Sequence, residues 1–354
     1  MSKVAFVKVK HVENGVHEAV WRAMELTDWK KYVNGKKIFV KINGISDQLV
    51  PGQCTSPWVV DAVLKKIKEH LPRAEIFIGD ANLAATEQLD KSAEVWGIKE
   101  LVKKYKIKFV NLSHQPLVET HLPGKKVHKL NFPKILLDVD CIVNLPVAKA
   151  HCLTKITCCL KNHWGLIPRF RHQYHIYVND VIADINKFFS KTTYNVVDAT
   201  ICLEGNAPRT GIPKICDVIF AGHDRVSIDT AAAVFMGFDP KKIGHILESE
   251  KRGVGETKYT IVGDKFYVDK FIEPEPSKQP IFFWEMLMRK VPIASYLIFR
   301  TPLFKIAAWG ATKYNTLWWY NLTGKKYAKE IIFDTWYGKE FRPLWDRSGG
   351  KGTI

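Results

Sequence analysis

Residues 37–42 read KIFVKI, residues 55–57 read TSP and residues 74–79 read AEIFIG, and these three stretches decide the fold. The first and the third are apolar runs of strand length, and the segment between them, 58–71, has the apolar spacing of a helix. Hydroxyl residues followed by proline are typical of a helix start. Together they predict a strand, a loop, a helix and a second strand, which is the repeating unit of a parallel sheet.

The same alternation continues on both sides of this unit. Further elements are predicted as strands at 3–9, 108–112, 135–145, 194–197 and 218–221, and as helices at 17–33, 91–106, 181–189 and 227–236. The predicted fold class is therefore α/β: a mostly parallel sheet with helices on both faces, built as one body or as two lobes, over residues 1–270.

Composition changes after a proline-rich stretch. Residues 273–280 read EPEPSKQP, and because proline disfavours both helix and sheet, we predict a linker over 271–280. The remaining residues, 281–354, contain six of the chain's 11 tryptophans and no acidic residue between Glu285 and Glu330. We predict a basic, aromatic, α-helical extension there.

This extension has two interpretations. Its apolar runs are interrupted by Arg300 and Lys305, so they stay below the roughly 18–20 residues that a membrane span needs. Cationic helices rich in tryptophan are typical of segments that lie on an anionic membrane surface. The alternative is a helical cap that packs on the α/β body, with its aromatic side chains in a core.

The basic composition restricts the partners. A formal net charge of +17 and a pI near 9.4 favour an anionic small molecule or an anionic membrane surface. The chain has no C2H2 spacing and no RNP-type aromatic motif, which disfavours nucleic acid. Seven cysteines without a C-x-x-C pair, and an N-terminus without an apolar leader, predict a cytoplasmic protein, peripheral at the inner face of the membrane if the extension binds lipid.

Polar residues follow the strand at 37–42. Lys41 and Asn43 stand at its end, where parallel sheets place functional groups. The helix start at Thr55 and Ser56 offers free backbone N–H groups and the positive end of the helix dipole, which can bind a carboxylate or a phosphate. A plain N-cap is the alternative.

Asp80 and Asn82 follow the strand at 74–79. They are weaker candidates for a base or a ligand, with a simple Asx-turn as the alternative.

The densest set of reactive side chains lies between residues 144 and 175. Its members are Lys149, His151, Lys155, Thr157, Lys161, Asn162, His163, Gly165, Arg169, Arg171, His172 and His175. Lysine binds anions or acts as a nucleophile, and histidine titrates near neutrality and ligates metals. We expect Lys41, Lys149 and Lys161 to contact an anion and His151 to be an acid/base group or a metal ligand. A scatter of surface charges is the alternative.

Carboxylates follow the later strands. Asp198 is predicted to end one strand and to open a long loop over 198–214 that contains Glu204 and Gly205. Asp224 and Asp229 follow the next strand. These residues are candidates for carboxylate catalysis or for metal coordination, with helix capping as the alternative for Asp229.

Four stretches, taken in order, resemble the domain-of-unknown-function family numbered 362. They are VKIN with GQCTSP, NLPVAKAH with TKITCCLKNHWGLIP, VVDATICLEGNAPRTGIPK, and FAGHDRVSIDTAAAVFMGFDP. The resemblance covers about residues 3–265. Some members of that family resemble fusions to a ferredoxin-like module with clustered cysteines, whereas this chain has a basic aromatic tail in that place.

The resemblance implies one shared pocket. Its members would be Lys41, Asn43, Thr55, Lys149, His151, Thr157, Lys161, Asn162, Gly165, Asp198, Glu204, Gly205, Asp224 and Asp229, with His172 or His175. The leading expectation is an enzyme that binds an anionic, lipophilic or lipid-linked small molecule. The alternatives are a carrier of a divalent metal or an iron–sulfur cluster, and a membrane-peripheral or nucleic-acid-binding module. The carrier would use His151, His163 and the nearby Cys152, Cys158 and Cys159, and the candidate ligands of a metal are His151, His175, Asp224 and Asp229.

Overall fold

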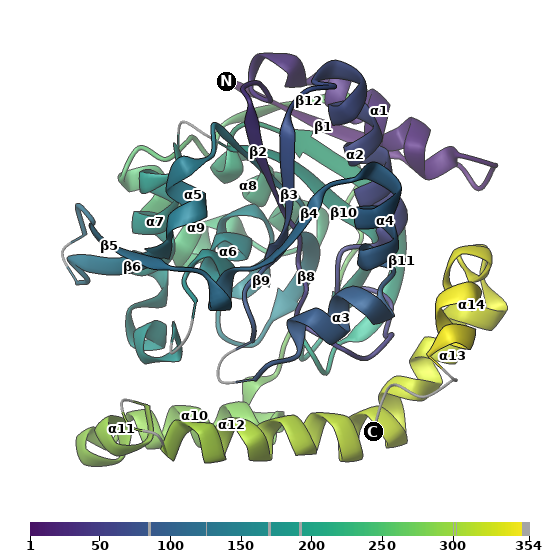
Figure 1. Ribbon diagram of the computed structural model, residues 1–354. Helices are drawn as coiled ribbons and strands as arrows, with labels where there is room; N and C mark the ends of the chain where they lie inside the picture. Colours follow the sequence, from purple (N-terminus) through teal and green to yellow (C-terminus); the bar gives the residue numbers. More distant parts are fainter. Residues whose placement is uncertain are drawn as a thin grey trace.

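A computed structural model describes residues 1–83, 86–124, 126–168, 171–190, 193–299, 301 and 303–348. Arg169, a member of the predicted cationic run, and Arg300, which the sequence places among the basic residues of the tail, lie outside these ranges. A ten-stranded mixed sheet forms the centre of the molecule, in the order β12-β1-β11-β10-β7-β2-β3-β4, with β8 beside β10 and β9 beside β8 (Figure 1). Its strands are β1 (Ser2–Lys8), β2 (Lys37–Lys41), β3 (Glu75–Asp80), β4 (Lys108–Asn111), β7 (Cys141–Asn144), β8 (Val147–His151), β9 (Lys155–Thr157), β10 (Thr193–Glu204), β11 (Ile212–Gly222) and β12 (Tyr259–Gly263).

Most neighbouring strands in this sheet are parallel. β4, β3, β2, β7 and β10 run parallel in series, and β8 is parallel to β10. Antiparallel pairing occurs where β11 meets β10 and β1, and where β9 meets β8. A separate two-stranded sheet pairs β5 (Leu117–His121) with β6 (Lys129–Pro133). The predicted α/β class with a mostly parallel sheet is confirmed, as a single main sheet.

Helices cover both faces of the sheet. They are α1 (Gly15–Leu26), α2 (Pro57–His70), α3 (Leu89–Val95), α4 (Ile98–Tyr105), α5 (Lys134–Asp138), α6 (Cys159–Asn162), α7 (Val178–Phe188), α8 (Arg225–Phe235) and α9 (Gly244–Lys251). Side chains alternate across a strand, so Ile38 and Val40 join one core while Phe39 joins the other. The first core lies under α1 to α4 and the second under α5 to α9.

The predicted loop over 198–214 is wrong. β10 continues through Asp198 to Glu204, and β11 begins at Ile212, so only a short turn joins them. The strand continues because almost every residue of β10 is buried, with β11 on one side and β7 and β8 on the other. A register shift between Ala199 and Ile201 marks where its pairing with β11 becomes irregular.

Three predicted elements are each divided in the structure. The helix predicted over 17–33 is α1 followed by a short 3-10 helix, η1 (Trp29–Lys31), and Asp28 between them is left-handed with φ of 53°. The helix predicted over 91–106 is two helices, α3 and α4, which Gly97 separates in a left-handed conformation with φ of 71°. The run 135–145 is the short helix α5 followed by β7. Asp140, just before β7, accepts backbone hydrogen bonds from Lys36 and Lys37, which starts the pairing of β7 with β2.

The tail forms a helical layer at one end of the body (Figure 1). Its helices are α10 (Pro280–Arg289), α11 (Pro292–Phe299), α12 (Leu303–Lys313), the π-helix η8 (Tyr314–Gly324), α13 (Lys325–Asp334) and α14 (Gly338–Arg347). α13 and α14 return to the body, where Ile332, Tyr337 and Phe341 join the first core. Within the described ranges, each helix is too short or too polar to cross a bilayer.

Candidate functional site

A cavity of about 550 Å³ lies between the carboxyl ends of the central strands and the tail. The body supplies its polar wall, including Lys41, Asn43 and Asp80 from the ends of β2 and β3 and Lys149 and His151 from β8. α10, α11 and α12 supply an opposite wall of apolar side chains: Ile281, Phe282, Met288, Ile298, Phe299, Phe304 and Ala308. The cavity is therefore amphipathic.

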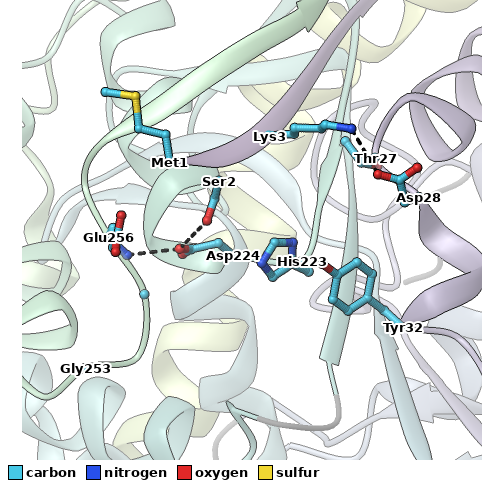
Figure 2. Close-up of a pocket in the computed structure, with 11 residues that line it drawn as sticks. Met1, Ser2, Lys3, Thr27, Asp28, Tyr32, His223, Asp224, Gly253 and Glu256 are labelled. Carbon is cyan, nitrogen blue, oxygen red and sulfur yellow. Dashed lines mark hydrogen bonds and ion pairs between the residues drawn. The ribbon is translucent and has the colours of Figure 1, made fainter.

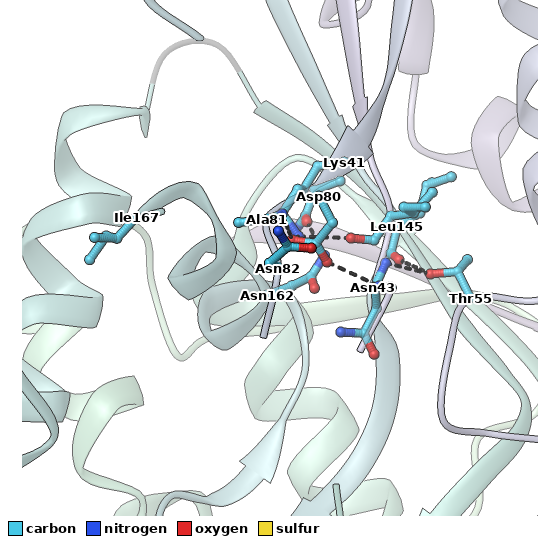
Figure 3. Close-up of polar contacts among 12 residues, drawn as sticks. Lys41, Asn43, Thr55, Asp80, Ala81, Asn82, Leu145, Asn162 and Ile167 are labelled. Carbon is cyan, nitrogen blue, oxygen red and sulfur yellow. Dashed lines mark hydrogen bonds and ion pairs between the residues drawn. The ribbon is translucent and has the colours of Figure 1, made fainter. Parts of the chain in front are cut away.

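A buried ion pair lies at the centre of the polar wall (Figure 3). Lys41 Nζ is 2.7 Å from Asp80 Oδ1 and also donates to the carbonyl oxygen of Ile42, while Asp80 Oδ2 accepts from the backbone of Gly44. Burial lowers the pKa of Lys41, and Asp80 opposes that shift. Gly165 passes so close that a Cβ there would lie 2.4 Å from Asp80 Oδ1. The absence of a side chain at Gly165 therefore allows α6 and the turn that follows it to lie close to the Lys41–Asp80 pair.

Lys149 is a second buried ammonium group in this wall. Its Nζ donates to the Asn43 side chain and to the carbonyl oxygen of Gln53, both of which are neutral acceptors. Among the described residues, no carboxylate lies within ion-pair distance of it. Burial lowers the pKa of Lys149 to about 8, against the attraction of nearby acidic groups. The site thus holds a cation without a direct counter-ion.

Lys161 is the most available cation of the cavity. It lies at α6, its Nζ is 5.1 Å from the centroid of the Trp164 ring, and in the described part of the chain it has neither a hydrogen-bond nor an ion-pair partner. Burial, and then the repulsion of Arg171, lower its pKa to about 7. The hydroxyl of Thr157 also lines the cavity and is buried without a partner among the described residues. Both groups are free to bind a ligand.

His151 ends β8 beside these lysines. Its Nδ1 accepts a hydrogen bond of 2.9 Å from the backbone N–H of Leu153, which places the ring proton on Nε2. Burial lowers the pKa of His151 well below its usual range, and Lys161 adds to that shift. The ring is therefore neutral at physiological pH, and Nε2–H remains as a donor.

A cluster of three polar side chains and one backbone carbonyl group joins the tail to the body at the cavity's edge. His175 Nδ1 is 2.8 Å from Glu285 Oε1, and Arg289 donates both to that carboxylate and to the carbonyl oxygen of His172. Burial raises the pKa of Glu285, but the hydrogen bond and charge of His175 and the charge of Arg289 outweigh it, so the pKa lies well below its usual range. Glu285 forms its contacts with His175 and Arg289, and its charge only partly offsets the lowering of the pKa of Lys161.

The structure brings nine of the predicted residues together around the cavity: Lys41, Asn43, Lys149, His151, Thr157, Lys161, Asn162, Gly165 and His175. His172, which was predicted as an alternative to His175, lines the cavity as well. Asn162 is held by Asn144, to which its side-chain amide donates at 2.8 Å.

The predicted anion seat at the start of α2 is filled by the protein's own carboxylate. Ser56 N–H donates to Asp198 Oδ2 at 2.8 Å, and Thr200 donates to Asp198 Oδ1 through its backbone and its hydroxyl. Thr55 accepts from the backbone of Asn43 and donates to Leu145. Thr55, Ser56 and Asp198 therefore hold the wall behind the cavity and do not line it.

Glu204 and Gly205 hold the chain that leads into the tail. Glu204 Oε2 accepts from the backbone N–H of Ile272, and Gly205 N–H donates to the carbonyl oxygen of Ile272. Gly205 has φ of 67°, which favours glycine. Neither residue lines the cavity, although the turn that they begin contributes Asn206 and Arg209 to it.

The metal set predicted from His151, His175, Asp224 and Asp229 is not one site. Asp224 lines a separate hollow of about 580 Å³ beside the N-terminus (Figure 2), where it caps α8 and accepts from Ser2 Oγ and the backbone of Glu256. Asp229 is fully buried beneath α6. Asp224 accepts from the first backbone N–H groups of α8, and Asp229 accepts from the first backbone N–H groups of α6.

One group of potential metal ligands does occur, outside the cavity. Single donor atoms of Cys158, Cys159 and Asp229 lie within 4.8 Å of one another. Asp229, however, accepts from the backbone N–H groups of Cys159 and Leu160 at 2.7 and 3.1 Å, and burial raises the pKa of both thiols. Asp229 was expected, as the alternative, to cap its own helix, but it lies inside α8, which Asp224 caps, and it binds the first backbone N–H groups of α6 instead.

Sequence reasoning missed three parts of the site. Asp80 was only a weak candidate, although its place at the end of a strand was a usable signal. Arg209 also lines the cavity and was not singled out, although it lies in a glycine-rich stretch, whereas Arg171, which lines it too, belongs to the predicted cationic run. The apolar wall had no local signal, because nothing in residues 280–315 indicates what they cover.

Residues 38–234 match the model of DUF362, a domain of unknown function, which confirms the resemblance seen in the sequence. The thylakoid-associated protein sll1697 of Synechocystis sp. (strain ATCC 27184 / PCC 6803 / Kazusa) is 23% identical over 239 residues, which cover 63% of this chain and 70% of that protein.

Among solved structures, the lactate racemase apoprotein from Thermoanaerobacterium thermosaccharolyticum is similar, with a TM-score of 0.38 and 14% identity. The match covers 71% of this chain and 57% of that one. This likeness is too loose to support an inference about the present chain.

Proposed function

The chain belongs to the DUF362 family, and from this membership and the cavity we propose that it is an enzyme acting on an amphiphile with a carboxylate or phosphate head group. The proposal rests on one observation: the two walls of the cavity face each other and differ in polarity. One wall is cationic, with ammonium groups that lack carboxylate partners, and the other is apolar.

The charge of the polar wall supports an anionic head group. Among the described residues that line the cavity, five are cations and two are carboxylates. The carboxylates are already engaged, Asp80 by Lys41 and Glu285 by His175 and Arg289. Lys149 and Lys161 are left with their charge directed to a ligand. Charge-assisted hydrogen bonds in a site of this kind contribute more than neutral ones.

The apolar wall supports a hydrocarbon portion. A volume of about 550 Å³ is within the usual size of small-molecule sites and exceeds what a bare anion requires. An anion alone would leave the side chains of Phe282, Phe299 and Phe304 facing water. The relative in Synechocystis is named for its association with thylakoids, and a membrane is a source of compounds with this chemistry.

Lys161 and His151 are the proposed proton-transfer groups. A lysine whose pKa is about 7 is divided between its two forms near neutral pH, so it can give or take a proton or attack a carbonyl carbon. The Nε2–H of neutral His151 can donate to an oxygen that gains negative charge. Lys149 is assigned to the binding of the anion.

The test is calorimetric titration of the protein with decanoate, laurate and decanol below their micelle concentrations. Laurate has two more methylene groups than decanoate, and each buried methylene contributes about 0.8 kcal/mol, so we expect laurate to bind about fifteenfold more tightly. Decanol lacks the charge and should bind at least tenfold more weakly than decanoate.

Lys161→Gln should lower the decanoate affinity about tenfold and leave decanol unaffected. Lys108→Gln is the matched control, since Lys108 is an exposed residue at the sheet edge that pairs with Glu75. Equal affinities for decanoate and decanol would refute recognition of the head group. Affinity that does not depend on chain length would refute the role of the apolar wall.

A further inference from the structure

The outer surface of the tail exposes an extended apolar face. We define the outer face as the exposed large apolar residues between 283 and 322. They include Ile293 (75% exposed), Ile306 (66%), Leu322 (65%), Trp309 (64%) and Trp318 (64%), together with Phe283, Val291, Tyr296, Leu297, Leu303 and Leu317. Contiguous exposed apolar surface of this kind marks an interaction site.

α12 illustrates why this face requires a partner. Phe304, Ala308 and Ala311 recur at helical spacing and line the cavity. Elsewhere on the helix, Leu303, Ile306 and Trp309 are exposed. A helix that is apolar on both sides is normally covered on both sides, whereas here only the inner side is covered by the body.

The charge of this surface identifies the partner. Residues 286–329 contain no acidic side chain, and Lys290, Lys305, Lys313 and Lys326 are exposed there. Of the two carboxylates that flank this stretch, Glu285 is turned inward to His175 and Glu330 lies 3.9 Å from Lys326. Lys290, Lys305 and Lys313 have no carboxylate partner among the described residues. Exposed tryptophans among lysines complement the interface of a bilayer with anionic lipid, in which indole rings lie at headgroup depth and ammonium groups meet phosphates.

We propose that the outer face of α10, α11, α12 and η8 docks in the plane of an anionic lipid bilayer. The described helices are too short or too polar to cross it, so the contact is peripheral. The inner face of the same helices lines the cavity, so docking brings the cavity beside the lipid (Figure 1). The docking proposal deepens the proposed function, because it names the bilayer as the source of the ligand. Only this statement about the ligand's source rests on the proposed function.

The test is flotation of the full chain with two kinds of vesicle, phosphatidylcholine alone and three parts phosphatidylcholine with one part phosphatidylglycerol. We expect flotation with the anionic vesicles, and at least tenfold less with the neutral ones. Ile306→Ser with Trp309→Ser should reduce flotation about tenfold or more. Lys305→Glu with Lys313→Glu should also reduce flotation about tenfold or more with the anionic vesicles, and should leave flotation with the neutral vesicles unchanged.

Matched controls are Val12→Ser with Val268→Ser, which alter exposed apolar residues of the body, and Lys241→Glu with Lys242→Glu. Both should float as the unaltered chain does, and urea midpoints confirm that all variants fold. None of the altered residues lines the cavity, so decanoate binding in solution should be unchanged. Lost flotation with intact decanoate binding separates this proposal from the proposed function.

Three outcomes would overturn the docking proposal. One is the absence of flotation with anionic vesicles. The second is equal flotation with both kinds of vesicle, which would remove the role of the lysines. The third is a concentration-dependent dimer, measured by analytical ultracentrifugation, that Ile306→Ser with Trp309→Ser abolishes. In that case a second copy of the chain covers the outer face.

Discussion

At the scale of single residues, the cavity depends on lysines whose charge is sensitive to pH. Burial lowers the pKa of Lys161 to about 7 and that of Lys149 to about 8. Each ammonium is cationic below its pKa and neutral above it. A bound carboxylate favours the cationic form, so binding and protonation reinforce each other.

This coupling predicts the pH dependence of ligand affinity. Laurate is fully ionised above pH 6.5, so only the protein titrates. We expect its affinity to be highest near pH 6.5 and to fall about tenfold or more by pH 9, as first Lys161 and then Lys149 lose their protons. Calorimetry across this range measures it. In Lys161→Gln the fall should begin about one pH unit higher, and a flat profile in the unaltered chain would contradict the assignment.

Gly165 provides a prediction about stability at the same scale. In Gly165→Ala the new Cβ would lie 2.4 Å from Asp80 Oδ1 and 2.8 Å from Lys41 Nζ, and the pair is fully buried. We expect the free energy of unfolding to fall by about 1–3 kcal/mol, measured by urea denaturation. Gly310→Ala in α12 is the control, because its Cβ meets nothing within 4 Å. That variant should gain about 0.5–1 kcal/mol, and loss of stability in both would point to a general effect.

At the scale of elements, local patterns predicted the parts whose environment is local. The strand at 37–42 and the helix after Pro57 are β2 and α2, because a buried strand and a proline-started helix each have a short-range signature. Lys41 then follows from the rule that parallel strands place functional groups at their carboxyl ends. Lys149 and His151 were found through the density of cations and histidines in 144–175, and the strand β8 that holds them was not predicted.

Elements decided by distant neighbours were not predicted. β10 was expected to end near Asp198, but pairing with β11, β7 and β8 extends it to Glu204. The same applies to the seat at Ser56, since the carboxylate that fills it lies 142 residues away. The aromatic residues of α10 and α12 showed that the tail is apolar, but which side covers the cavity depends on the contact of Glu285 with His175.

At the scale of the whole molecule, the tail covers two different parts of the body. α10 to α12 lie over the cavity, whereas α13 and α14 complete the first core beside α2. Tyr337 donates to Asp217 on β11, and Trp336 stacks on His11 at a centroid distance of 4.8 Å. α13 and α14 pack on the body as a cap, whereas membrane binding by the exposed outer face stays a proposal.

This division predicts that the last helix stabilises the body itself. Phe341 is fully buried, with its ring 4.7 Å from that of Trp58 on α2 and 6.1 Å from that of Trp96. Phe341→Ala should lower the free energy of unfolding by about 3–5 kcal/mol, measured by urea denaturation. Phe333→Ala, at a position 43% exposed, is the matched control and should cost less than about 1 kcal/mol.

The spectroscopic signal separates a shared core from an independent tail. If α14 belongs to the body's core, Phe341→Ala shifts a single transition seen both by tryptophan fluorescence and by far-ultraviolet circular dichroism. If the tail unfolds on its own, the variant gives an early transition of small amplitude and leaves the main one in place. The rings of Trp58 and Trp96 lie on body elements and contact Phe341 directly, so we expect the single shifted transition.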